Sequence, residues 1–161
     1  MNTANLPAQS SKTNIQKVKL LIFSIGNLNV ALHIDTVQKV VNYTTIFGSG
    51  LNYYGLVNID GKEITVIDLH KRLFNTPQIL TSEDKKYLLL AINSEGETFG
   101  ILIKSTPELY DISLDTIREL PLSYRRADTL KIASHVTVME EEDQQKTIFI
   151  LDPDELIRPM S

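Results

Sequence analysis

The sequence predicts a mainly β protein made of two small antiparallel barrels of five strands each, and each barrel is followed by a short helix. Two observations support this fold class. Short runs of β-branched and aliphatic residues alternate with turn residues along the chain, as is typical of all-β domains. In addition, the order of strands, turns and helix in the first half recurs in the second half, which indicates an internal duplication.

The clearest unit is the stretch from Gly55 to Phe74. Residues 56–59 and 64–67 are β-prone, and residues 64–67 are rich in β-branched side chains. Asp60 and Gly61 lie between the two runs and suit a tight hairpin turn, because both residue types tolerate positive φ. Residues 69–74 then predict one or two helical turns with their leucines on one face. The stretch therefore predicts a hairpin that leads into a short helix.

The second half repeats these elements in order. The first half has a hairpin at 17–34, an extended segment at 40–46, a hairpin at 56–67 and a helix at 69–74; the second has a hairpin at 87–104, an extended segment at 108–112, a hairpin at 131–151 and a helix at 153–157. We therefore expect a folded region at 17–158. Its first barrel spans about 17–74, with packing from the C-terminal helix, and its second about 86–152. Residues 1–16 are polar and unpatterned, and predict a disordered tail.

Each second hairpin ends in an aspartate, Asp68 or Asp152. One interpretation is a pair of carboxylates for acid–base chemistry. The other is N-capping, in which each aspartate accepts a hydrogen bond from a backbone N–H of the following helix. The repeat favours capping, because it places each aspartate at a helix start. Gly61 is likewise expected to have a structural role in its turn.

The composition argues against several classes of function. The net charge is −4 with no clustered basic face, so no nucleic-acid partner is expected. Cysteine is absent, and the three histidines are isolated, so no metal site or cofactor is expected. No nucleotide-binding loop or nucleophile motif is present, which predicts a protein that is not an enzyme. The apolar runs are too short to cross a bilayer and no secretory signal is apparent, which predicts a cytoplasmic location.

These patterns resemble the CheW-like domain family, the adaptors of bacterial chemotaxis. Residues 55–69 are similar to the family signature G-V-I-N-L-R-G followed by I-V-P-V-I-D-L. Residues 37–40 resemble its V-Q-E-I segment, and residues 99–103 resemble its V-G-I-V-V strand. The resemblance covers nearly the whole chain after residue 16, and implies two five-stranded barrels with a hydrophobic interior between them.

The resemblance implies a non-catalytic adaptor. Such a protein couples methyl-accepting receptors, through their signalling tips, to the regulatory domain of a CheA-type histidine kinase, in arrays that meet the membrane only through the receptors. The family's arginine before the turn glycine is Asp60 here, and the resemblance places that position on the receptor-contact surface. An alternative is therefore a CheW-like scaffold of a pilus-motility array, or of another kinase array, with a non-standard input protein.

The expected partner surface follows from the resemblance. Its predicted residues are Val37, Lys39, Val40, Asn58, Asp60, Gly100 and Thr106. Val37 and Val40 are three apart in a predicted helical turn, so they should share one side; the alternative is that they seal a barrel end. Asp60 is alternatively only a favourable turn residue. If it contacts the receptor, Asp60→Arg should raise the affinity for a conventional receptor tip.

Overall fold

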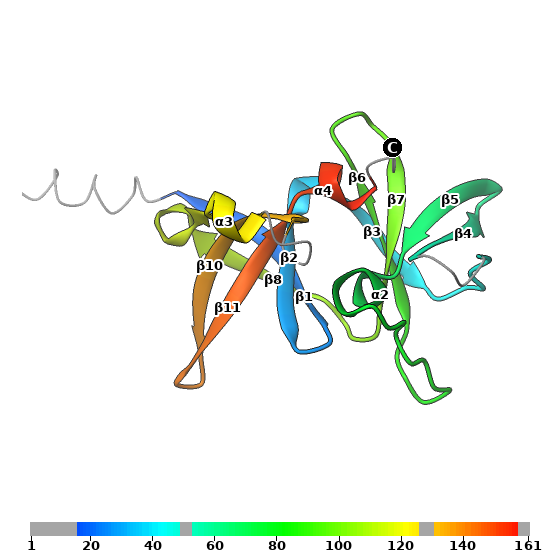
Figure 1. The fold of residues 1–161 in the computed structure, drawn as a ribbon, viewed down its shortest axis with the longest axis horizontal. Helices are drawn as coiled ribbons and strands as arrows, with labels where there is room; N and C mark the ends of the chain where they lie inside the picture. Colours follow the sequence, from blue (N-terminus) through cyan, green and yellow to red (C-terminus); the bar gives the residue numbers. More distant parts are fainter. Residues whose placement is uncertain (1–15, 49–52, 126–130, 158–161) are drawn as a thin grey trace, which may run out of the picture.

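Two β-sheets lie side by side in the computed structural model, which describes residues 16–48, 53–125 and 131–157 (Figure 1). The predicted tail therefore lies outside the described residues, except for Gln16, whose carbonyl accepts a hydrogen bond from the Leu114 N–H at 2.9 Å. The prediction of a mainly β protein with two groups of strands and few short helices is confirmed. The expected five antiparallel strands in each group are corrected in detail, because one sheet has six strands and each sheet contains one parallel pair.

The larger sheet has six strands in the order β8-β1-β2-β11-β10-β9. Its strands are β1 Lys17–Ile25, β2 Leu28–His33, β8 Glu108–Ser113, β9 Arg118–Glu119, β10 Ala133–Glu141 and β11 Gln144–Leu151. The smaller sheet has five strands in the order β3-β6-β7-β5-β4. Its strands are β3 Val37–Asn42, β4 Tyr54–Ile59, β5 Lys62–Ile67, β6 Tyr87–Ile92 and β7 Thr98–Ile103.

Short helical segments connect the strands. These are η1 Ile34–Thr36, α2 Leu69–Phe74, η2 Leu114–Thr116, α3 Leu122–Arg125 and α4 Pro153–Leu156. Strand β9 and helix α3 fall where the sequence predicted no strand or helix. Strand β9 is only two residues long, and it pairs with β10 through His135 and Val136. Such a short strand has no periodicity of its own to detect.

The sheets do not follow the two halves of the sequence, which corrects the expected division into 17–74 and 86–152. Hairpin β1–β2 pairs with β8 and β11 from the second half, whereas hairpin β6–β7 pairs with β3 and β5 from the first half. Each sheet therefore combines the first hairpin of one half with the later strands of the other. The sequence pattern did not reveal this exchange, because the alternation within each strand is the same whichever hairpin it pairs with.

The exchange nevertheless preserves the internal repeat. The repeat relates β1 to β6, β2 to β7, β3 to β8, β4 to β10 and β5 to β11. When each strand is exchanged for its equivalent, the order β3-β6-β7-β5-β4 of the smaller sheet becomes β8-β1-β2-β11-β10, which is the order of the first five strands of the larger sheet. The parallel pairs β2–β11 and β5–β7 are equivalent in this scheme. The N–H groups of Asp68 and Asp152 donate to Tyr53 and Ile132, each at 2.8 Å, so the two strand ends are also equivalent.

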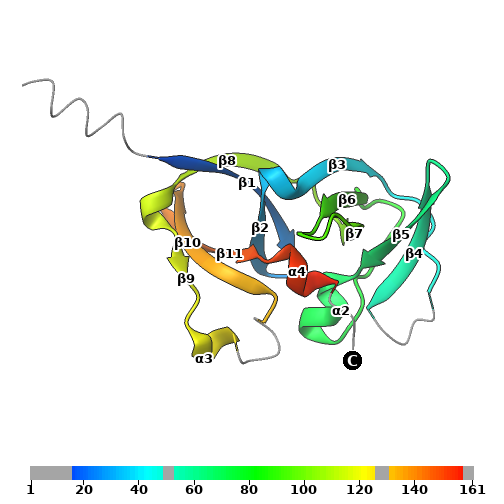
Figure 2. The same ribbon diagram turned by 90° about the horizontal axis from the view of Figure 1, so that it is seen from above.

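Three apolar clusters form the core. One lies within the six-stranded sheet and includes Leu20 and Ile22; another lies within the five-stranded sheet and includes Leu88 and Leu90. The largest lies between the sheets, and residues such as Leu21 contribute to it. Successive residues of β1 thus enter different clusters, so both faces of this strand are covered and its sequence is almost continuously apolar. Figure 2 shows the two curved sheets with α2 and α4 between them on one side.

Candidate functional site: the exposed edge strand and two end pockets

Strand β3 forms one edge of the five-stranded sheet and carries three of the seven predicted partner residues, Val37, Lys39 and Val40, near its start. Val37 and Val40 lie on this strand, and not in a helical turn as expected, because η1 ends at Thr36. They still share a face. A bulge between Val37 and Lys39 places Val37 opposite Ala91 and Val40 opposite Leu89, and both partners belong to the cluster between the sheets.

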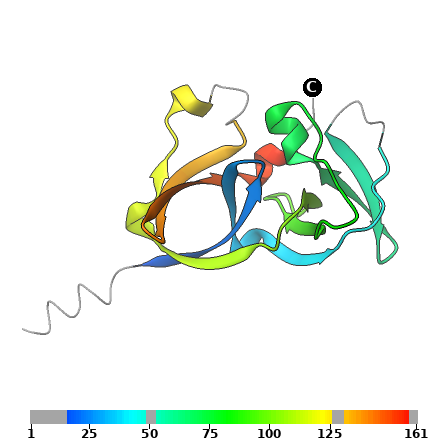
Figure 3. The ribbon, with the colours of Figure 1, turned by 90° about the horizontal axis from the view of Figure 1, so that it is seen from below.

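The two valines differ in exposure. Val37 is half-buried and packs against the central cluster, whereas Val40 is 38% exposed. On the neighbouring sheet, Leu109 of β8 is 50% exposed and lies opposite Leu21, another residue of the central cluster. The views from above and below both place β3 and β8 on the same side of the molecule (Figures 2 and 3). This side therefore presents aliphatic side chains along the border between the sheets.

Lys39 points to the other face of β3, toward the interior of the five-stranded sheet, because it lies opposite Leu90. Its Nζ is 3.6 Å from Oδ2 of Asp60, which occupies the β4–β5 turn with φ 52°. The two side chains are 54% and 81% exposed, so water screens their attraction. The structure thus brings together two predicted residues that are far apart in the sequence.

These two residues border a pocket of about 480 Å³ at the end of the five-stranded sheet, here called the Lys39 pocket. Ile59, Ile64 and Leu90 supply its apolar lining. The remaining lining residues are polar or charged, and comprise Gln38, Lys39, Asp60, Lys62, Glu63, Glu97 and Thr98. An apolar base within a charged rim suits a protruding aliphatic side chain of another protein.

The other predicted partner residues lie elsewhere. Asn58 is exposed on β4, but it alternates with the inward-facing Val57 and therefore lies on the outer face. Thr106 is exposed and lies beside a pocket of the other sheet. Gly100 is buried, and a Cβ atom there would lie 3.1 Å from Val66 Cγ2. The expectation that Gly100 contacts a partner is therefore corrected: its lack of a side chain allows close packing inside the sheet.

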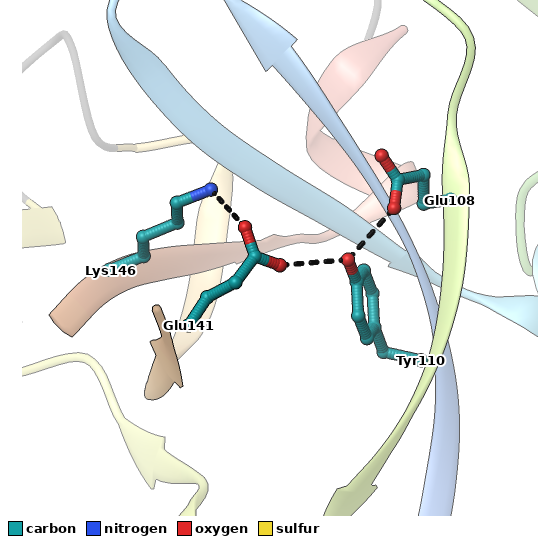
Figure 4. A network of polar contacts seen from close by, with 4 residues as sticks. All are labelled: Glu108, Tyr110, Glu141 and Lys146. Atoms are coloured by element: carbon teal, nitrogen blue, oxygen red, sulfur yellow. Dashed lines mark hydrogen bonds and ion pairs between the residues drawn. The ribbon is translucent and has the colours of Figure 1, made fainter. Parts of the chain in front are cut away.

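The pocket beside Thr106 has a volume of about 190 Å³ and lies at the end of the six-stranded sheet; it is here called the Tyr110 pocket. Tyr110 Oη shares its proton between Glu108 Oε2 at 2.8 Å and Glu141 Oε2 at 3.0 Å, and Lys146 Nζ donates to Glu141 Oε1 at 2.8 Å (Figure 4). Glu141 belongs to β10, so the network joins β8 to a strand on the far side of the sheet. A second link comes from η2, where Thr116 Oγ1 is 2.9 Å from Oγ1 of the buried Thr137 on β10.

The network affects the ionisation of its members. Hydrogen bonding to Glu108, then to Glu141, holds the pKa of Tyr110 above its ordinary value. The hydrogen bond from Lys146 is the main cause that lowers the pKa of Glu141, and Glu141 in turn raises the pKa of Lys146. These directions are those of a structural network that keeps tyrosine neutral and the ion pair charged. Apart from the acidic residues 140–143, no pattern in the sequence predicts this network.

The two aspartates at the hairpin ends lie at helix starts. Asp68 Oδ1 accepts a hydrogen bond from the Lys71 N–H at 3.2 Å, and its Oδ2 accepts one from the Gln78 N–H at 3.1 Å. Asp152 Oδ1 accepts from the Asp154 N–H at 3.0 Å. Both carboxylates therefore bond to backbone groups, as N-caps do. Gly61 has φ 81° next to Asp60, a conformation that suits glycine in a tight hairpin turn.

Within the described residues, no three histidine, aspartate or glutamate side chains come together in a way that could hold a metal ion. His33 Nδ1 accepts a hydrogen bond from the Asp35 N–H, and His70 Nδ1 lies 2.6 Å from the Thr76 carbonyl oxygen. In the same parts of the chain, no helix is both long and apolar enough to cross a membrane.

Comparisons with known proteins agree with this fold. The sequence profile of the CheW-like domain family matches residues 19–159. The fold is similar to the crystal structure of the scaffolding protein TtCheW from Thermoanaerobacter tengcongensis, with a TM-score of 0.71 and 21% sequence identity, over 89% of this chain and 90% of that chain. A search of curated protein sequences gave no match.

Proposed function

Because the chain belongs to the CheW-like domain family, we propose that it is a non-catalytic adaptor that couples methyl-accepting receptors to a CheA-type histidine kinase. The observation that carries this proposal is the family match over residues 19–159, together with an aliphatic border between two interlocked sheets. The adaptor acts in the cytoplasm and reaches the membrane only through the receptors. It needs no cofactor, since its role is to hold two proteins in a fixed arrangement.

The exposed side formed by β3 and β8 supports this role. Val40 and Leu109 are exposed, one on each sheet, and lie opposite Leu89 and Leu21 of the central cluster, so a partner that contacts both buries aliphatic area on both sheets. Contact with both sheets fixes the partner's orientation relative to the whole molecule. A receptor movement is then transmitted to the kinase by the difference in contact energy between two arrangements.

Aspartate at position 60 favours the second candidate, an adaptor of a pilus-motility array or another kinase array with a non-standard input protein. The family signature has arginine at this position and glutamate at the position of Lys39. Both charges are reversed here, and the two side chains face each other. The kinase-binding role is common to both candidates, and the identity of the receptor separates them.

Val40→Asp tests the proposed surface. Calorimetry measures binding to the regulatory domain of the cell's CheA-type kinase, and co-sedimentation measures binding to membranes that contain its receptors. We expect at least one affinity to fall about tenfold or more, because a carboxylate in an apolar contact is desolvated without a partner. Val40 is a better target than Val37, whose packing against the core makes a charge there destabilising.

The matched control is Val138→Asp, which places the same charge at a 48% exposed valine on β10 of the other sheet. It should leave both affinities unchanged. If Val40→Asp binds both partners like the wild type, the proposed surface is wrong. If the wild type binds neither the kinase domain nor the receptor membranes, the adaptor function itself is wrong.

A further inference from the structure

The Lys39 and Tyr110 pockets occupy equivalent places in the internal repeat, and their strand registers show this residue by residue. Counting back two residues from the capping aspartates gives Val66 and Ile150, which lie opposite Gly100 and Ala31. Gly100 and Ala31 lie opposite Leu90 and Ile22, respectively. Finally, Leu90 lies opposite Lys39, and Ile22 lies opposite Glu108. Lys39 and Glu108 are therefore equivalent residues.

Two residues further along the same strands, Val41 is the equivalent of Tyr110. Val41 lies opposite Leu88 and Tyr110 lies opposite Leu20, each in the cluster inside its sheet. The phenol ring of Tyr110 reaches the carboxylates at its pocket. A valine has no side chain that reaches so far, so the Lys39 pocket has no equivalent plug.

The charged rim of the Lys39 pocket has a fixed polarity. Lys39 places a positive charge on β3, and Asp60 places a negative charge at the β4–β5 turn. At 3.6 Å and with both side chains more than half exposed, the pair adds little to stability. A charge arrangement with little structural value at the border of an apolar pocket indicates recognition, in which charge order determines which partner is accepted.

From this geometry, and resting on the proposed function, we propose that the Lys39 pocket binds a receptor-tip segment with reversed charge order. The segment inserts an aliphatic side chain against Ile59, Ile64 and Leu90, with a basic residue next to Asp60 and an acidic residue next to Lys39. A tip suited to glutamate and arginine at these two positions meets like charges and is rejected. Lys39 and Asp60 together therefore determine specificity.

The proposal changes the expectation for Asp60→Arg. Arginine at position 60 would face Lys39, so the single substitution creates two neighbouring positive charges instead of the family's charge order. Only the exchange of both residues, Lys39→Glu with Asp60→Arg, gives that order. The effects of the two substitutions on the free energy of binding should therefore be strongly non-additive.

The experiment measures calorimetric binding of the full chain to two receptor-tip fragments. One comes from a receptor of the same cell; the other comes from a receptor whose own adaptor has glutamate and arginine at the two positions. We expect the double exchange to weaken binding of the first tip by about tenfold or more and to strengthen binding of the second by a similar factor. Each single substitution should weaken binding of the first tip and should not strengthen binding of the second.

A second variant tests the pocket itself. In Val41→Tyr, the added ring should fill the Lys39 pocket as the Tyr110 ring fills the Tyr110 pocket. The affinity for the first tip should therefore fall by about tenfold or more. Val138→Tyr adds the same ring at an exposed site and is the matched control. Exchange of the exposed ion pair Lys19–Asp111 on the other sheet controls for charge, and should leave tip binding unchanged.

Binding to the kinase regulatory domain distinguishes failure of the charge-order proposal from failure of the proposed adaptor function. If the kinase binds normally but the double exchange changes neither tip affinity by more than about twofold, the charge-order proposal is overturned and the adaptor function stands. Full strengthening of the second tip by Asp60→Arg alone also overturns it. If Val41→Tyr does not fold, the double exchange still decides, because both exchanged residues are exposed.

Discussion

The ends of the two sheets share one backbone plan and differ in how they are filled. At the Tyr110 pocket, an aromatic ring, two carboxylates and an ammonium group form a connected network over a volume of about 190 Å³. At the Lys39 pocket, one loose ion pair borders about 480 Å³ above aliphatic side chains. The first arrangement joins strands of its own sheet, whereas the second leaves apolar surface accessible.

Two sequence differences account for this contrast. Tyr110 stands where the other sheet has Val41, as the strand registers show. The β10–β11 hairpin also extends farther from its helix than β4–β5: eight residues of β11 precede Asp152, but only six residues of β5 precede Asp68. The extension carries Glu141 to Tyr110. A duplicated fold can thus use one end for its own cohesion and the equivalent end for recognition.

The comparison is tested most strongly by truncating one aliphatic residue at each end. Ile148 is fully buried beneath the Tyr110 network, and its equivalent Ile64 is 8% exposed at the Lys39 pocket. Both alanine substitutions should destabilise by about 2–5 kcal/mol, with Ile148→Ala the more severe, because its enclosed cavity is harder to relax. Urea unfolding at neutral pH measures both. Equal losses would show that the two ends are equally well packed.

A smaller effect is expected for Tyr110→Phe, which keeps the ring and removes the shared hydrogen bonds to Glu108 and Glu141. Loss of these bonds near the surface should cost about 1 kcal/mol in the free energy of unfolding. The control is Tyr87→Phe, since among the described residues the Tyr87 hydroxyl has only a 3.5 Å contact with Thr106 Oγ1. If the two variants are equally stable, the network does not join the strands.

The pH dependence of this loss has a defined sign. The pKa of Glu141 is lowered, so its contribution is present above the unfolded-state pKa and is lost as the pH falls through the lower folded-state value. The pKa values of Tyr110 and Lys146 are raised, so their contributions are lost only as the pH rises through those folded-state values. The difference between wild type and Tyr110→Phe should therefore be largest near neutral pH and shrink in acid. A difference that persists unchanged below about pH 3 contradicts this account.

The smallest effect on stability is expected at the Lys39 pocket. Lys39→Met and Asp60→Asn should each change the free energy of unfolding by less than about 0.5 kcal/mol, because the ion pair is exposed and asparagine also tolerates the positive φ at position 60. Thermal unfolding of both variants is the measurement. A loss well above this value would assign the pair to structure, and so weaken the contrast between the two ends.

The sequence was sufficient to identify most strands, the helix at 69–74 and the repeat, because these depend on local periodicity and turn residues. It did not reveal which hairpin enters which sheet, since that depends on pairing between distant strands. The same limit applies to the candidate site. Lys39 and Asp60 were each expected at a partner surface, but their contact arises from the curvature of the sheet. Gly100 was misplaced because a strand pattern with both faces buried does not show which face meets a partner.

The exchange of hairpins between the sheets has a consequence for the order of folding. When β1 and β2 leave the ribosome, their neighbours β8 and β11 have not yet been synthesised. Leu21 and Phe23 of β1 and the edges of the hairpin stay uncovered until nearly the whole chain has been made, a condition that favours aggregation and slow, non-local folding. Neither half of the sequence contains a complete sheet. We therefore expect the two sheets to fold together, and neither half to be stable by itself.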